Sequence, residues 1–258
     1  MLPILQESVV ATYRDHDLVT VEAGIPANLL LLRGLCETER GNARLHALAG
    51  QLYFSFAYGF VEDTDRERAA GLYAEGLRLG RQGLSGKPWF VTEGPLEELT
   101  PRLQEIDRDD VPLLFWTIAN WSGWINLRLD DPAAVAQLGM VEAYLGRVLE
   151  LEPDYFLGMP HVMLGAMQCF RPVMFGGKPE EGRAHIEEAQ RISGNRMLLY
   201  HVFFAQYYCR QTLDEDGFTR SLERVRNAPD DLLPEYRLFN EVAKRKAALL
   251  MEQKDDLF

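Results

Sequence analysis

The chain has 258 residues, of which 47% are hydrophobic and 26% charged, a composition typical of an ordinary globular protein. Its formal net charge of -12 and its pI near 4.9 disfavour binding to nucleic acid or to an anionic membrane surface, since both partners need a clustered basic face. The sequence shows no continuous apolar run of about eighteen residues, so we expect no membrane span.

The opening residues, MLPILQESVV, contain neither a basic leader nor a long apolar stretch, so they predict no signal peptide. The cysteines Cys36, Cys169 and Cys209 are too few and too scattered for a disulfide framework or a paired metal motif. We expect them to be buried as small core residues, which is where free cysteine is usually found.

The first third of the chain predicts four helices. Pro26 suits the first turn of a helix, where its missing amide hydrogen costs nothing, so we expect a helix to start there. Thr64 and Glu67 have the spacing of a capping box, in which each side chain satisfies a free amide at a helix start. The four expected helices cover residues 1–23, 27–39, 42–60 and 64–84.

The middle of the chain predicts a loop and one strongly amphipathic helix. Residues 85–101 are rich in glycine and proline, which favours a long loop with at most one short turn of helix. Loops of this length often carry function. Asp131 and Pro132 then give a strong helix start, and Pro153 closes the helix. Apolar residues on one face of this helix recur at spacings of four, three, four and three: Ala134, Leu138, Val141, Leu145 and Val148.

The last part of the chain predicts further helices joined by short turns. Pro160 falls inside the first of them, where a kink or a helix start is expected, and Gly194 ends the second. Residues 171–179 read as a turn between these two helices. The expected helices cover residues 154–170, 180–192, 197–210, 214–226 and 234–250.

No segment alternates apolar and polar residues as a half-buried strand would, so we predict an all-α fold. Three helices repeat a pattern in which small or apolar residues flank a large one, which favours close helix pairing. The three sets are Ala69, Tyr73 and Gly76; Val141, Leu145 and Val148; and Gly182, Ile186 and Ala189. We therefore expect a divergent tetratricopeptide-like array of helical hairpins, with about ten to eleven helices in a single domain over residues 1–258.

Sequence signatures of catalysis are not found. The five histidines include no pair at three- or four-residue spacing, and Gly176-Gly177-Lys178 lacks the spacing of a phosphate-binding loop. Paired carboxylates such as Asp130-Asp131 precede predicted helices and are explained by capping. We therefore expect no catalytic residue, no metal and no cofactor.

A concentration of aromatic and amide side chains is the best candidate for a site. It lies on the helix that contains Trp121 and is followed by a Pro-His pair. One interpretation is a large core with its indole and amide groups hydrogen-bonded, and the other is an apolar cavity with a few polar groups, which is typical of small-molecule sites. On the second interpretation the ligand-lining residues are Trp116, Trp121, Trp124, Asn126, Pro160 and His161.

Four phrases of the sequence occur in a recognisable order: WSGWINL at 121–127, LELEPDY at 149–155, GMPH at 158–161 and RPVMFGG at 171–177. Together they resemble one protein family, the T-component of tripartite ATP-independent periplasmic (TRAP) transporters. The resemblance implies a non-enzymatic, tetratricopeptide-type helical subunit in the periplasm, often a lipoprotein. It further implies a homotrimer whose protomers each have a ligand-accessible pore or cleft, and which docks the transporter's substrate-binding protein. The implied ligand is a hydrophobic or amphipathic small molecule. Export rests on this resemblance alone, since the sequence shows no leader and no lipid-bearing cysteine near its start.

Two other functions stay open from the sequence. A general tetratricopeptide-type scaffold would bind an extended or helical peptide on a concave face, although such faces are usually polar rather than aromatic. An enzyme with His161 as general base is a third possibility, for which the sequence offers no partner residue.

Overall fold

The computed structural model describes residues 2–171, 173 and 176–258. All of its regular elements are helical, with 78% of residues in helices and no strand within the described ranges, so the all-α prediction is confirmed. The number of helices is a little higher than predicted, and the tetratricopeptide-like arrangement stays a prediction. The chain divides into two compact units, Val19–Glu152 and Pro3–Leu18 with Pro153–Phe258, which are described separately. The prediction of a single domain stays untested.

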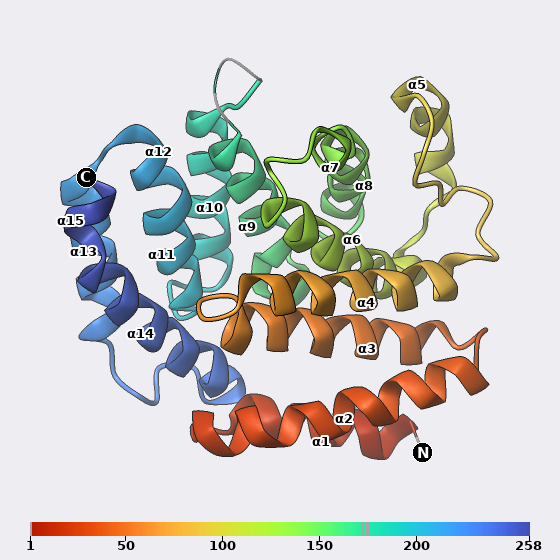
Figure 1. Cartoon of the computed structure of the whole chain (residues 1–258), viewed down its shortest axis with the longest axis horizontal. Coiled ribbons are helices and arrows are strands. Elements are labelled where there is room, and N and C mark those ends of the chain that lie inside the picture. The colour runs from red at the N-terminus through yellow and green to blue at the C-terminus, as the bar shows by residue number, and fades with distance from the viewer. Residues whose placement is uncertain (1, 172, 174–175) are drawn as a thin grey trace. The chain divides into compact units, whose positions relative to one another are not determined.

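The first unit holds the longer helices of the chain's first half (Figure 1). Its elements are α2 (Leu18–Thr38), α3 (Ala43–Phe56) with a π-helical turn η1 (Ala57–Val61), α4 (Arg66–Leu84), α5 (Leu96–Leu99), η2 (Thr100–Glu105), η3 (Arg108–Asp110), α6 (Val111–Asn126), α7 (Pro132–Val135) and α8 (Leu138–Leu151).

Helices α3, α4 and α6 pack against one another and form the core of the first unit (Figure 1). Asn120 of α6 is fully buried among them, and its Nδ2 donates to the carbonyl oxygens of Gly50 at 2.8 Å and Trp116 at 2.7 Å. Gly76 of α4 faces the same amide, because a Cβ at that position would lie 2.2 Å from Asn120 Oδ1. The predicted pattern of small residues therefore does bring α4 and α6 into close contact.

Two predicted helix starts in this unit are wrong. Helix α2 runs from Leu18 to Thr38 with Pro26 inside it, so the helix starts eight residues before the proline. The cap of α4 is Asp65 rather than Thr64, since the Asp65 carboxylate accepts from the Arg68 amide at 3.0 Å. The Thr64 hydroxyl instead donates to the carbonyl of Val61 at 3.2 Å.

The predicted helix over 132–152 is broken at Gln137. The start is as expected, with the Asp131 carboxylate accepting from the Ala133 amide at 2.8 Å. The Gln137 side chain then donates to the Ala133 carbonyl at 3.0 Å, and the Gln137 backbone amide bonds to Ala134 instead. The side chain thus takes the acceptor that a continuing helix needs, so α7 ends and α8 begins. The predicted apolar stripe is nevertheless fully buried.

The second unit is built mainly from the chain's second half. Its elements are α1 (Leu2–Arg14), α9 (Tyr155–Phe170), α10 (Pro179–Ile192), α11 (Leu199–Phe203) with a π-helical continuation η5 (Phe204–Cys209), α12 (Arg210–Thr212), α13 (Glu215–Arg226), η6 (Pro234–Tyr236), α14 (Arg237–Glu252) and α15 (Lys254–Leu257). The predicted turn at 171–179 includes residues 172 and 174–175, which lie outside the described ranges.

Helices α9 and α10 pack closely against each other in the second unit. A Cβ on either Gly165 or Gly182 would lie 2.6 Å from the other residue's carbonyl oxygen, so only glycine permits this approach. Near its start α9 contains three residues with left-handed backbone angles, Phe156, Leu157 and Gly158. Pro160 follows in the first turn of the restarted helix, which matches the helix start that the proline predicts.

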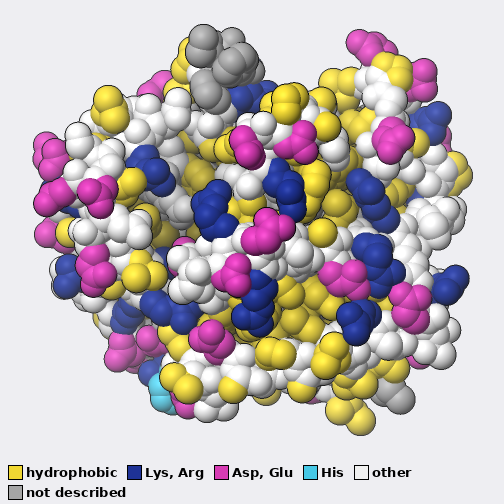
Figure 2. All heavy atoms as spheres, in the orientation of Figure 1, with side chains coloured by type: hydrophobic (Ala, Val, Ile, Leu, Met, Phe, Trp, Pro, Cys, Tyr) yellow, Lys and Arg dark blue, Asp and Glu magenta, His cyan; other side chains and the backbone are white. Residues whose placement is uncertain are grey.

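More than half of the residues of helix α2 are exposed. Within the described part of the chain it is the one helix long and apolar enough to cross a membrane, and 22% of its most apolar window is buried. Its exposed apolar side chains include Val19, Leu30 and Leu31. Apolar atoms reach the surface along the lower edge of Figure 2, where α2 lies in Figure 1. The absence of a membrane span therefore stays a prediction.

Candidate functional site

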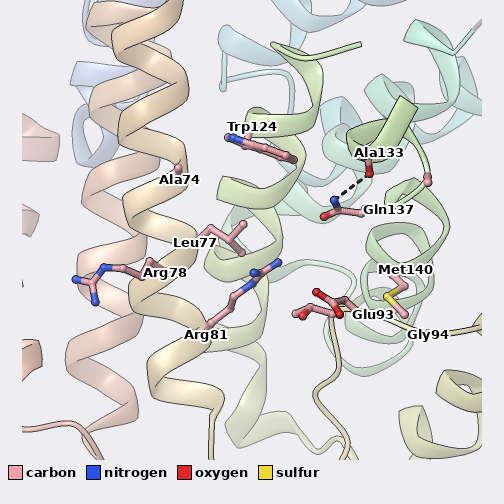
Figure 3. Close-up of a pocket in the computed structure, with 12 residues that line it drawn as sticks. Ala74, Leu77, Arg78, Arg81, Glu93, Gly94, Trp124, Ala133, Gln137 and Met140 are labelled. Carbon is pink, nitrogen blue, oxygen red and sulfur yellow. Dashed lines mark hydrogen bonds between the residues drawn. The ribbon is translucent and has the colours of Figure 1, made fainter. Parts of the chain in front are cut away.

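A cavity of about 720 Å³ opens in the first unit between α4, α6, the α7–α8 turn and the loop that precedes α5 (Figure 3). Its volume is within the range of small-molecule binding sites. The side chains that determine its chemistry are Leu77 and Arg81 of α4, Glu93 of the loop, Trp124 of α6, and Gln137 and Met140 at the start of α8.

One part of the cavity wall is apolar. Leu77 and Met140 are buried residues, and Trp124 is half-buried, so its indole has one side in the protein and one side available to the cavity. The Arg128 guanidinium lies 5.4 Å from the centre of the Trp124 ring. A cation over an indole is an attractive contact that fixes the ring's orientation.

Arg81 supplies positive charge to the same cavity. Its guanidinium carbon lies 5.3 Å from the centre of the Trp121 ring, and its Nε is buried without a hydrogen-bond partner. Burial lowers the pKa of Arg81, while the charge of Glu93 raises it in part. In Figure 3 the Arg81 side chain extends from α4 toward Glu93, whereas the neighbouring Arg78 extends the other way.

Gln137 connects the cavity wall to the core. Its Oε1 accepts from Trp121 Nε1 at 2.7 Å, and its Nε2 donates to the Ala133 carbonyl (Figure 3). Trp121 is therefore held from two sides, by this hydrogen bond and by the Arg81 guanidinium. The contacts fix the geometry of Arg81, Trp121 and Gln137 before any ligand arrives.

The loop with Glu93 is anchored by Tyr144 of α8. The Tyr144 hydroxyl accepts from the Val91 amide at 2.7 Å and lies 3.1 Å from the Trp89 carbonyl, to which it can donate. Trp89 is itself buried, whereas Glu93 is exposed at the cavity rim. The long loop predicted at 85–101 thus contributes to the cavity from an anchored base.

The ligand-lining residues expected on α6 have different environments. Trp116 and Trp121 are buried, with 1% and 0% of their surface exposed, and neither lines the cavity. Trp124 does line it, while Asn126 is half-buried outside it. The two interpretations of this aromatic helix therefore apply to different residues, since Trp116 and Trp121 are core and Trp124 faces the cavity.

Pro160 and His161 belong to the second unit. Pro160 is buried, and the half-buried His161 has its Nδ1 at 2.9 Å from Nδ1 of His185 on α10. Burial is the main cause that lowers the pKa of both imidazoles, and the mutual charge adds to it for His161. At this distance one imidazole must donate and the other accept, so at least one of the pair is neutral. In the described ranges no group of three His, Cys, Asp or Glu side chains is placed to hold a metal.

Sequence reasoning missed Arg81, Glu93 and Gln137. The sequence does contain a signal for Arg81. It lies four residues after Leu77 and eight after Tyr73, so this charged residue falls on the apolar face of its helix. Glu93 and Gln137 carry no such signal, since a glutamate in a loop and a glutamine after a helix start are both ordinary surface patterns.

Comparison with known proteins gives one family. A family model described as TRAP transporter T-component matches residues 14–258, which is nearly the whole chain. No curated protein matches the chain.

Proposed function

The chain belongs to the TRAP transporter T-component family, and on this premise we propose that it binds a small molecule in the cavity of the first unit and docks the transporter's substrate-binding protein. The family role is that of a transporter accessory subunit. The ligand would be hydrophobic or amphipathic, and the subunit would act without catalysis.

The cavity is the observation that carries the ligand-binding part of this proposal. It combines about 720 Å³ of space with an apolar wall and a few polar groups, which is the usual composition of a small-molecule site. The half-buried indole of Trp124 offers a large apolar face at little entropic cost. Burial of a ligand against this face, Leu77 and Met140 would provide most of the affinity.

The proposal extends to location and assembly. We propose a periplasmic location and a homotrimeric state because the family resemblance implies them. The net charge of -12 favours a substrate-binding protein with a basic docking patch, through electrostatic steering. Titration calorimetry between the two proteins at low and at high salt tests docking. A complex that binds more weakly in high salt would support an electrostatic contribution to docking, and no binding at either salt concentration would contradict docking.

Native mass spectrometry of the purified chain, followed by organic extraction, tests assembly and ligand together. A trimer that carries a small apolar compound supports the proposal. A ligand-free monomer would instead favour the tetratricopeptide-type peptide-binding scaffold.

A matched pair of variants assigns the ligand to the cavity. Trp124→Ala should lose the extracted compound, whereas Leu129→Ala, at an exposed position outside the cavity wall, should retain it. Far-UV circular dichroism should show unchanged helical content for both. If Trp124→Ala loses its helical structure instead, Trp124 acts as a core residue.

A further inference from the structure

Two arginines of α4 line the cavity, but they differ in their charge partners. Arg78 is paired twice, with Nη2 at 2.8 Å from Glu75 Oε1 and Nη1 at 3.0 Å from Glu37 Oε1. Arg81 makes no ion pair and no hydrogen bond within the described part of the chain, and its Nε is buried. Figure 3 shows Arg78 directed away from the cavity and Arg81 directed into it.

The unpaired Arg81 is held in place rather than left mobile. Its guanidinium covers the buried ring of Trp121, which is hydrogen-bonded to Gln137. A charged group that is partly removed from water and has no close ion pair is unfavourable, and the more distant charge of Glu93 offsets this cost only in part. An anion that arrives with the right geometry relieves the remaining cost. The planar guanidinium, already oriented, suits the two oxygens of a carboxylate.

Among the described residues that line the cavity, Glu93 is the one acidic residue. It lies on the exposed loop at the rim, where water weakens its charge, and its effect on the pKa of Arg81 is smaller than that of burial. The inner part of the cavity is therefore positive, and the apolar side chains Leu77, Trp124 and Met140 border it.

From these contacts we infer that the cavity binds an amphipathic carboxylate, whose carboxylate pairs with Arg81 and whose apolar part lies against Trp124, Leu77 and Met140. This inference rests on the proposed ligand-binding function and adds the chemical class of the ligand. Arg81 provides selectivity for the charged end, and the apolar wall provides the area of contact.

Isothermal titration calorimetry of the full chain with octanoate, 1-octanol and octylamine tests the inference, because the three probes share one apolar tail and differ in charge. Octanoate should bind about tenfold or more tightly than 1-octanol, as a charge-assisted hydrogen bond implies, and octylamine should bind most weakly.

Four variants locate the effect. Arg81→Gln should remove the advantage of octanoate and leave 1-octanol binding unchanged, and Arg81→Lys should restore part of it. Arg78→Gln is the matched control, because Arg78 lies on the same helix and at the same cavity. It should leave the affinities for octanoate and for 1-octanol unchanged. Glu93→Gln should strengthen octanoate binding about two- to threefold, since it removes a like charge at the rim.

The outcomes separate this inference from the proposed function. Equal binding of octanoate and 1-octanol, with both lost in Trp124→Ala, would overturn the role of Arg81 and keep ligand binding in the cavity. Preferential binding of octylamine would also overturn the role of Arg81, because it would indicate that Glu93 pairs with the charged end of the ligand. Absence of binding by all three probes would overturn both proposals.

Discussion

Gly76→Ala is expected to destabilise the first unit, although alanine is the better helix former. A Cβ at Gly76 would lie 2.2 Å from Oδ1 and 2.5 Å from Cγ of Asn120. Asn120 cannot move away without losing the hydrogen bonds that its amide donates to Gly50 and Trp116. The substitution therefore forces either compression at the contact of α4 with α6 or the loss of both bonds.

Compression at the contact and loss of the two hydrogen bonds cost a similar free energy. Two lost hydrogen bonds cost about 1 kcal/mol each, and overpacking of a core costs about 1–3 kcal/mol. The gain in helix propensity from glycine to alanine offsets about 1 kcal/mol of either cost. The net effect should be a loss of about 1 kcal/mol in the free energy of unfolding, within a range of about 0–2 kcal/mol.

Gly71→Ala is the control, on the same helix but exposed, where a Cβ would meet nothing within 4 Å. It should stabilise the protein by about 0.5–1 kcal/mol, because only the propensity changes. Urea denaturation followed by far-UV circular dichroism gives both values. If Gly76→Ala is as stable as Gly71→Ala, the contact of α4 with Asn120 is not as close as described.

Three further predictions concern pH, thiols and the cavity loop. Burial lowers the pKa of His161 and His185, so below about pH 6.5 the unfolded chain binds more protons than the folded chain. The free energy of unfolding should therefore fall from pH 7 to pH 5. Urea denaturation at both pH values should show that the free energy of unfolding falls less for His185→Gln than for the unchanged protein. An equal fall in the two proteins would contradict the role of this histidine pair. All three cysteines are buried, with thiol pKa values raised to about 12, so Ellman's reagent should label none of them in the folded protein and all of them in guanidinium. Tyr144→Phe removes the acceptor of the Val91 amide, so hydrogen exchange at Val91 should accelerate while exchange in α6 stays unchanged.

The all-α fold and most helices follow from sequence patterns that act locally. Apolar periodicity and the Asp131-Pro132 start depend on residues within one or two turns, so they can be read directly. The break at Gln137 could not be predicted, because its cause is a side chain that bonds Ala133 and also reaches Trp121 on another helix. Local patterns do not contain such long-range contacts.

The candidate site shows the same limit. Trp124 was predicted as a ligand-lining residue together with Trp116 and Trp121, because the three share one helix and one chemistry. Which of them faces a cavity depends on how α6 packs against α4 and α8, and spacing alone does not give this. The contact of His161 with His185 likewise joins residues 24 positions apart, beyond the reach of any helical periodicity.

The four tryptophans differ in their access to water, and this difference gives the cavity an optical reporter. Trp89, Trp116 and Trp121 are 3%, 1% and 0% exposed, so a neutral collisional quencher such as acrylamide should scarcely reach them. Trp124 is the exception, with its indole at the cavity. The fraction of emission that acrylamide quenches therefore measures how open the cavity is, and a molecule that fills it should protect that fraction without any added label.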